Sequence, residues 1–184
     1  AVQSYGLPPA NAPRRSQEIP AGLAISSDGQ RLYVAGNLSN RLLELDAASG
    51  KLLRTWDVGF APYDVALVNG KAFVSNWGGR RPNAGDLTGP GGRGTLVRVD
   101  PVRHIASEGS VTVLDLEGKT LSREILVGLH SSALATSPNG RYVVVANAGS
   151  DTVSVIDTKQ ERVIETIWMR QNPADLFGAS PNAL

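Results

Sequence analysis

Short apolar runs alternate with tight polar turns along the chain, and the same order of elements occurs three times. Each unit opens with a short apolar strand and then reverses at an Asp-Gly or Asn-Gly dipeptide. Such dipeptides favour two-residue hairpins because they tolerate positive φ where the chain turns. The three turns are Asp28-Gly29, Asn69-Gly70 and Asn139-Gly140. Each unit is therefore predicted to begin with a β-hairpin.

The second half of each unit has its own strand pattern. The second strand is nearly all apolar, which is typical of a strand buried on both faces. Asparagine follows it at Asn37, Asn76 and Asn147. A third, alternating strand ends at Asp46, Asp115 and Asp157, and a more amphipathic outer strand completes the unit. We interpret the recurring aspartates as caps of the following turn rather than as catalytic groups, because Asp accepts hydrogen bonds from turn N–H groups.

The spacing between units predicts the architecture. Pro20 and Pro62 are 42 residues apart, and so are Asp115 and Asp157. A period of about 40–45 residues with four strands per unit is typical of a β-propeller blade. We therefore predict an all-β chain that forms a partial β-propeller of four-stranded antiparallel blades over residues 20–184. An ordinary meander or sandwich would not repeat turn, strand and aspartate in one order.

The repeated segments also resemble a known family. Tyr33-Val-Ala-Gly36, Phe73-Val-Ser-Asn76 and Val144-Val-Ala-Asn147 are similar to the YVTN-repeat β-propellers of exported bacterial and archaeal proteins. Residues 75–82 and 173–182 resemble a subgroup in which the propeller precedes an alkaline-phosphatase-like phosphoesterase domain. The resemblance implies a seven-bladed propeller and a periplasmic, secreted or cell-surface location.

The blade boundaries follow from the repeat. Three blades are expected at residues 20–59, 62–128 and 131–169, and the start of a fourth at residues 181–184. Seven such blades need about 290 residues, so we expect either a longer protein or a propeller completed by another chain. Any phosphoesterase domain would lie beyond Leu184.

Residues 1–19 form a leader that has no periodic pattern. It is predicted to be an extended segment across the surface or, alternatively, a strand that completes a blade. The leader lacks the basic-then-apolar order of a secretory signal. If the protein is exported, we expect the signal to have been removed or to lie upstream.

Composition limits the available chemistry. The chain is 41% hydrophobic and 19% charged, and 18 Lys and Arg against 17 Asp and Glu leave a formal charge of +1. We therefore expect no strong attraction to nucleic acid or to an anionic membrane. The absence of cysteine excludes thiol catalysis and sulfur-ligated metal. Only His104 and His130 remain for histidine chemistry.

Two blades exceed the repeat length. Pro62 to Ser131 spans 69 residues, against a repeat length of 42, and we place the excess at residues 77–107. Ser131 to Pro181 spans 50 residues and also exceeds the repeat length. In an antiparallel blade, the connection between strands two and three leaves from the same end as the connection to the next blade. Both insertions are therefore predicted on one face, here called the inserted face. Departures from a repeat are where function is usually added.

The insertion is rich in arginine and glycine. Its arginines are Arg80, Arg81, Arg93, Arg98 and Arg103, against Asp86 and Asp100. Guanidinium groups suit phosphate or carboxylate ligands, but they could equally pair with carboxylates and carbonyls of the loop to hold it in shape. The Gly-x-Gly-x-x-Gly match at residues 89–94 does not predict a dinucleotide site, because no helix follows it.

We predict a non-catalytic binding or scaffolding platform with its contacts on the inserted face. The expected contact residues are Trp77, Arg80, Arg81, Asp86, His104 and His130. For Trp77 and the histidines, packing within the fold is the competing explanation. The expected partner is a protein or a small anionic ligand, besides the blades that complete the propeller. No catalytic residue, metal, cofactor, nucleic acid or membrane span is predicted.

Two other functions are compatible with the sequence. The chain could be the propeller portion of a hydrolase, either phosphoesterase-linked or lactonase-like. Such chemistry needs carboxylates and histidines that converge, usually on a metal. A structural or adhesion protein of the cell surface would need only the repeat.

Overall fold

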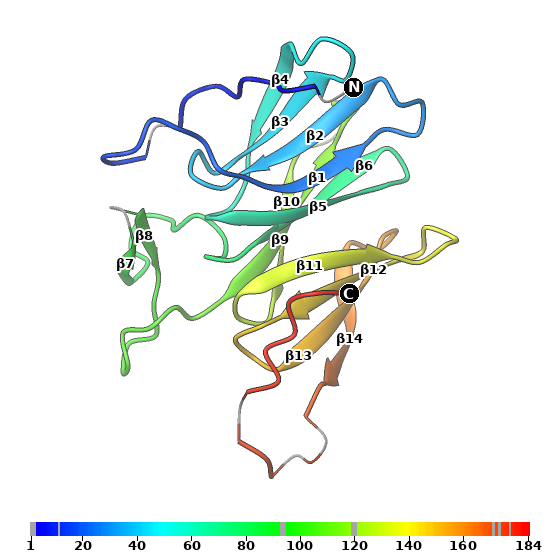
Figure 1. The fold of residues 1–184 in the computed structure, drawn as a ribbon. Helices are drawn as coiled ribbons and strands as arrows, with labels where there is room; N and C mark the ends of the chain where they lie inside the picture. The colour runs from blue at the N-terminus through cyan, green and yellow to red at the C-terminus, as the bar shows by residue number, and fades with distance from the viewer. Residues whose placement is uncertain are drawn as a thin grey trace.

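The fold consists of three four-stranded antiparallel blades and one two-stranded hairpin (Figure 1). It was obtained as a computed structural model, which describes residues 3–10, 12–92, 95–118, 121–170, 172, 174–176 and 178–184. In this part of the chain there is no α-helix, and thus no helix that could span a membrane. The prediction of an all-β, partial β-propeller is confirmed.

Each blade is a meander in which strands neighbouring in the sheet follow one another in the repeat. The first blade contains β1 (Pro20–Ile25), β2 (Arg31–Gly36), β3 (Arg41–Asp46) and β4 (Leu52–Asp57). The second contains β5 (Pro62–Val68), β6 (Lys71–Asn76), β9 (Gly109–Asp115) and β10 (Arg123–Val127). The third contains β11 (Ser131–Thr136), β12 (Tyr142–Asn147), β13 (Thr152–Asp157) and β14 (Arg162–Trp168). The hairpin of β7 (Thr88–Gly92) and β8 (Thr95–Arg98) is inserted between β6 and β9.

Apolar side chains between adjacent blades form the core. Phe73 on one side of β6 packs with Val143 and Val145 of the third blade. Val74, on the opposite side of the same strand, packs with Leu42 of the first blade. A strand that is buried on both faces must be apolar at consecutive positions. Blade stacking therefore explains the nearly continuous apolar sequence of β6.

Strand register shows which positions of the blades are equivalent. The equivalent pairs are Gly36–Arg41, Asn76–Ser110 and Asn147–Thr152. In the second and third blades, the asparagine amide donates to two hydroxyl groups of the next strand. Glycine occupies this position in the first blade, so the grouping of Asn37 with the other asparagines was wrong by one residue. Asn37 donates instead to the carbonyl oxygen of Pro62, at 3.1 Å.

The recurring aspartates cap turns, as predicted. Each accepts a hydrogen bond from a backbone N–H of the turn after the third strand of its blade. The acceptor–donor pairs are Asp46 with Ser49 at 2.9 Å, Asp115 with Glu117 at 2.9 Å and Asp157 with Gln160 at 2.8 Å. Carboxylates engaged in this way hold the turns.

The leader runs in an extended path along the first blade (Figure 1). Leu7 packs on Val34, Leu43 and Leu45, on the face of the blade that is turned away from the second blade. The Glu18 carboxylate accepts the backbone N–H groups of Leu38 and Ser39, at 2.9 and 3.2 Å. These contacts fasten the described residues of the leader to the first blade.

The last residues are hydrogen-bonded to the third blade. The Asp151 carboxylate accepts the N–H groups of Gly178 and Ser180, at 2.7 and 2.8 Å. The Ser132 hydroxyl donates to the carbonyl oxygen of Pro181, at 3.3 Å. No strand is assigned over residues 181–184, so a fourth blade stays a prediction. Residues 173 and 177 of the stretch used for the subgroup resemblance lie outside the described residues.

Candidate functional site

The connections between strands two and three meet the connections between blades at one end of the structure. The Ala61 N–H donates to Asn40 Oδ1 at 2.8 Å, and the Trp77 N–H donates to the Ala61 carbonyl at 3.1 Å. In the third blade, the Gly149 N–H donates to the Leu129 carbonyl at 3.0 Å. Figure 1 shows the β7–β8 hairpin at this end, with the β1–β2 and β11–β12 turns at the other. These contacts define the inserted face in space.

Three rings are stacked on this face. The rings of Trp77 and His130 have centroids 4.6 Å apart and planes inclined by 12°. Tyr63 lies on Trp77 with a centroid distance of 5.6 Å and an angle of 22°. Both distances are in the range of favourable aromatic contacts. Because Tyr63 belongs to β5 and His130 immediately precedes β11, the stack joins the inner strands of the second and third blades.

The position of the His130 ring depends on the backbone conformation of His130 and on the absence of a side chain at Gly149. Its φ of 54° is in the left-handed region, and its carbonyl oxygen accepts the Ala148 N–H at 3.2 Å. A Cβ atom on Gly149 would lie 2.6 Å from the imidazole Nδ1, so only glycine leaves room for the ring. Desolvation by burial lowers the pKa of His130, which favours the uncharged imidazole at neutral pH.

Arg80 and Asp86 belong to a ring of alternating charges within the insertion. Arg80 contacts Asp86 at 3.0 Å and Glu108 at 3.3 Å. Arg98 closes the ring, with an ion pair to Asp86 at 3.3 Å and a second to Glu108. The hydrogen bond from the Asn83 N–H is the main cause that lowers the pKa of Asp86, and the hydrogen bond from Arg80 is the next. Arg80 and Asp86 thus hold the insertion in shape, which is the second of the two interpretations considered for the arginines.

Arg81 fastens the insertion to the first blade. Its guanidinium group donates to the carbonyl oxygens of Val58 and Asn40, at 2.7 and 2.8 Å. It also lies 3.4 Å from the Asp57 carboxylate. Arg81 therefore has a structural role as well. Arg93 of the insertion lies outside the described residues.

His104 lies apart from Trp77 and His130, two of the other predicted contact residues. It is exposed in the turn after β8, and its N–H donates to the Asp100 carbonyl at 3.1 Å. The described residues show no contact between His104 and either His130 or Trp77. Within the same residues, no three His, Cys, Asp or Glu side chains are grouped so that they could hold a metal ion.

The insertion also exposes large apolar side chains, which the sequence pattern did not single out. They are Leu87, Leu96, Val102 and Ile105, between 45% and 84% exposed. Exposed apolar side chains that lie together on a surface mark interaction sites.

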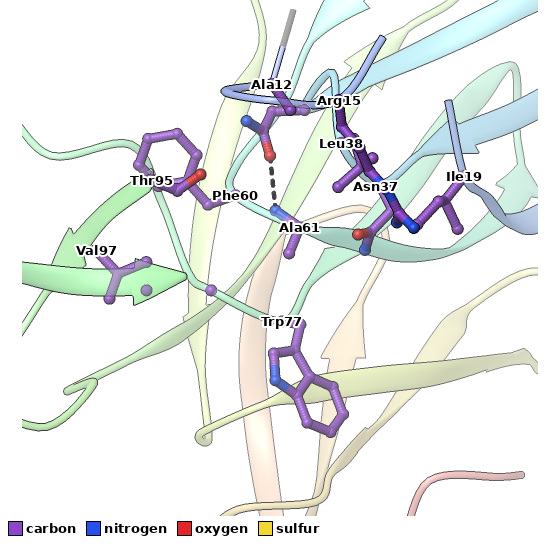
Figure 2. A pocket seen from close by; sticks show the side chains of 13 residues that line it. Ala12, Arg15, Ile19, Asn37, Leu38, Phe60, Ala61, Trp77, Thr95 and Val97 are labelled. Atoms are coloured by element: carbon purple, nitrogen blue, oxygen red, sulfur yellow. Dashed lines mark hydrogen bonds between the residues drawn. The ribbon is translucent and has the colours of Figure 1, made fainter. Parts of the chain in front are cut away.

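A cavity of about 330 Å³ lies between the leader, the loops of the first blade and the inserted hairpin. Ala12, Arg15 and Ile19 of the leader line one part of it, and Thr95 and Val97 of β8 line another. Figure 2 shows Phe60 and Thr95 on one side and Asn37 and Leu38 on the other. The Trp77 indole points away from them. Sequence patterns could not reveal the cavity, because its walls come from five separate segments of the chain.

Comparisons with known proteins support the fold. The family model of the Cytochrome D1 heme domain matches residues 102–180. No curated protein matches the sequence. Among solved structures, hydrazine synthase of Kuenenia stuttgartiensis is similar, with a TM-score of 0.62 and 22% identity over 91% of this chain and 39% of that chain.

Two further structures are similar at lower identity. A putative 6-phosphogluconolactonase of Bacteroides fragilis has a TM-score of 0.53 and 17% identity, over 89% of this chain and 40% of that chain. The β-propeller domain of Cps50 (Swd1) of Myceliophteria thermophila has a TM-score of 0.54 and 10% identity, over 85% of this chain and 43% of that chain. At these identities the likeness shows the β-propeller fold alone. The chain spans about two fifths of the length of these structures.

Proposed function

We propose that the chain is a non-catalytic binding platform on which a protein partner contacts the inserted face. The observation that carries the proposal is an insertion held by ion pairs and hydrogen bonds that also exposes apolar side chains. The charge ring and the Arg81 contacts hold the insertion on the blades, while Leu87 and Val102 remain exposed. A surface held in its binding conformation loses less entropy on association. The blades then serve as the support that positions this surface.

Site-specific photo-cross-linking in the source cells tests the proposal. The full-length protein would carry a photoreactive phenylalanine either at Leu87, on the insertion, or at Gln30, an exposed residue of the β1–β2 turn on the opposite face. We expect the Leu87 position to give a discrete cross-linked partner and the Gln30 position to give none. Equal cross-linking from both positions, or a discrete partner only from Gln30, would contradict the proposal.

The second candidate is the propeller portion of a hydrolase, either lactonase-like or linked to a phosphoesterase domain. Its support is the neighbour from Bacteroides fragilis, whose printed description names a lactonase. Metal analysis of the full-length protein, with lactone and phosphodiester substrates, tests this candidate. Turnover that survives loss of the insertion's apolar side chains would favour the hydrolase over the platform.

The family and the cellular location belong to the same proposal. The repeat residues support membership of the YVTN-repeat propellers, and we infer from that an exported protein that is periplasmic, secreted or at the cell surface. We also infer that further blades complete the propeller. Val153, on the side of β13 opposite to Ile156, belongs to the blade face that such a blade would cover. Cell fractionation with cytoplasmic and periplasmic markers tests the location.

A further inference from the structure

We propose that the cavity between the leader and the inserted hairpin binds a small organic anion with an apolar or aromatic body, and that Arg15 holds its charged group. This site goes beyond the proposed partner surface. It lies between the leader, the loops of the first blade and the inserted hairpin, whereas the partner surface consists of exposed apolar side chains of the insertion. Its walls, charge and hydrogen-bond donors each support the same class of ligand.

The walls suit an apolar body. Ile19 and Leu38 line one part of the cavity, and Phe60 and Val97 line another (Figure 2). A volume of about 330 Å³ lies within the range of small-molecule sites. Burial of an apolar or aromatic body against these side chains would supply most of the affinity.

The charge favours an anion. Arg15 is the only charged residue that lines the cavity, and within the described residues it forms no ion pair. This distinguishes it from Arg80 and Arg81, whose guanidinium groups already hold the insertion. The acidic residue of the leader, Glu18, is buried and accepts N–H groups of the neighbouring backbone. Arg15 is therefore available to a carboxylate or phosphate, with which guanidinium forms strong charge-assisted hydrogen bonds.

Asn40 provides a second donor. Its Oδ1 atom accepts the Ala61 N–H at 2.8 Å, which fixes the orientation of the amide. Among the described residues, the Asn40 Nδ2 group donates to no other group, although Asn40 lines the cavity. A few converging polar groups in an apolar cavity are what orient a small ligand. A cation would be repelled by Arg15, and a neutral molecule would gain no charge-assisted hydrogen bond from it.

Fluorine NMR titration of the full-length protein tests the proposal, with para-fluorobenzoate as the anionic probe and para-fluorobenzyl alcohol as its neutral analogue. We expect the anion to bind about tenfold more tightly than the alcohol, as one charge-assisted contact predicts. Arg15→Gln should weaken binding of the anion by about tenfold and leave the alcohol unaffected. Arg14→Gln is the matched control, because it removes the same charge one residue away and outside the cavity lining. It should change binding less than twofold.

A second variant locates the site. Thr95→Trp, which adds bulk at the wall formed by β8, should abolish binding of both probes while circular dichroism shows an intact β-sheet. Equal affinity for the anion and the alcohol, or equal effects of Arg15→Gln and Arg14→Gln, would overturn the proposal. Binding that survives Thr95→Trp would also overturn it. A negative result in these titrations would not count against the proposed partner surface, because cross-linking at Leu87 is measured without either probe.

Discussion

The indole ring of Trp77 lies on the imidazole ring of His130, with centroids 4.6 Å apart and planes inclined by 12°. Trp77 begins the insertion of the second blade, and His130 is the last residue before the third. The contact therefore links the segment proposed to bind a partner with the packing of two blades. The insertion is therefore in direct contact with the blades at this point.

A double-mutant cycle measures the coupling between these two rings. Trp77→Leu and His130→Asn each remove one ring, and asparagine tolerates the positive φ of His130. We expect a coupling energy of about 0.5–1.5 kcal/mol in the free energy of unfolding, the usual range for stacked rings. Urea denaturation of the four proteins gives the value. Additive single effects would show that the rings do not interact.

Burial of His130 predicts a pH dependence of stability. Because its pKa is lower in the folded state than in the unfolded state, the unfolded chain takes up the proton first as the pH falls. The wild-type protein should therefore lose stability below about pH 7, relative to His130→Asn, until the folded-state pKa is passed. Urea denaturation between pH 7.5 and pH 5 compares the two proteins. An NMR titration midpoint for His130 above the ordinary histidine value would reverse the predicted sign.

Glu108 is expected to be the most sensitive member of the charge ring. Its side chain is 8% exposed and pairs with Arg80 and Arg98, so Glu108→Gln leaves both arginines to share the Asp86 carboxylate. We expect a loss of about 1–3 kcal/mol, below the value for fully buried pairs because both arginines are partly exposed. Faster hydrogen exchange should be confined to the insertion. Arg103→Gln, which breaks the exposed pair with Asp100, is the control and should cost less than about 0.5 kcal/mol.

Arg80 and Arg81 are expected to affect stability rather than anion binding. The double variant Arg80→Ala with Arg81→Ala removes an ion-pair member and two hydrogen bonds to backbone carbonyls. We expect the free energy of unfolding to fall by about 1–3 kcal/mol, with unchanged affinity for para-fluorobenzoate. Loss of that affinity in a variant of normal stability would assign the anion contact to these arginines instead of Arg15.

Gly128 is required by the close approach of the second and third blades. A Cβ atom there would lie 2.7 Å from the Cβ atom of Asn147, whose amide is hydrogen-bonded to Thr152 and Ser154. Gly128→Ala should therefore cost about 1–3 kcal/mol through overpacking. Gly6→Ala is the matched control, because no heavy atom lies within 4 Å of its added methyl group. Thermal unfolding compares the variants, and equal transition temperatures would contradict the predicted contact.

The blades were predictable because their signals are local. Asn-Gly turns, apolar strands and capping aspartates each depend on a few neighbouring residues, so they can be recognised in the repeated sequence. The error at Asn37 has a physical cause: Gly36 takes the position of the hydrogen-bonded asparagine in the first blade. The alignment of residues 33–36 with residues 73–76 already places Gly36 at this position, whereas grouping by residue type selected Asn37.

The functional site was less predictable because it depends on contacts between distant segments. Tyr63 belongs to an ordinary strand pattern, and only the fold brings it onto Trp77. The arginines could be counted, but whether each meets a carboxylate depends on how the insertion folds. Arg15 has no motif of its own, and its place in a cavity wall arises from the path of the leader.

Removal of the insertion tests most directly whether the inserted face binds the partner. Replacing residues 78–108 by Gly-Ser leaves a connection of four residues between Asn76 and Ser110, the length found between Asn147 and Thr152 in the third blade. The measurement is the affinity of this full-length variant for the partner that cross-links at Leu87. The account predicts an intact β-sheet by circular dichroism and no detectable partner binding. An intact variant that binds the partner with wild-type affinity would contradict it.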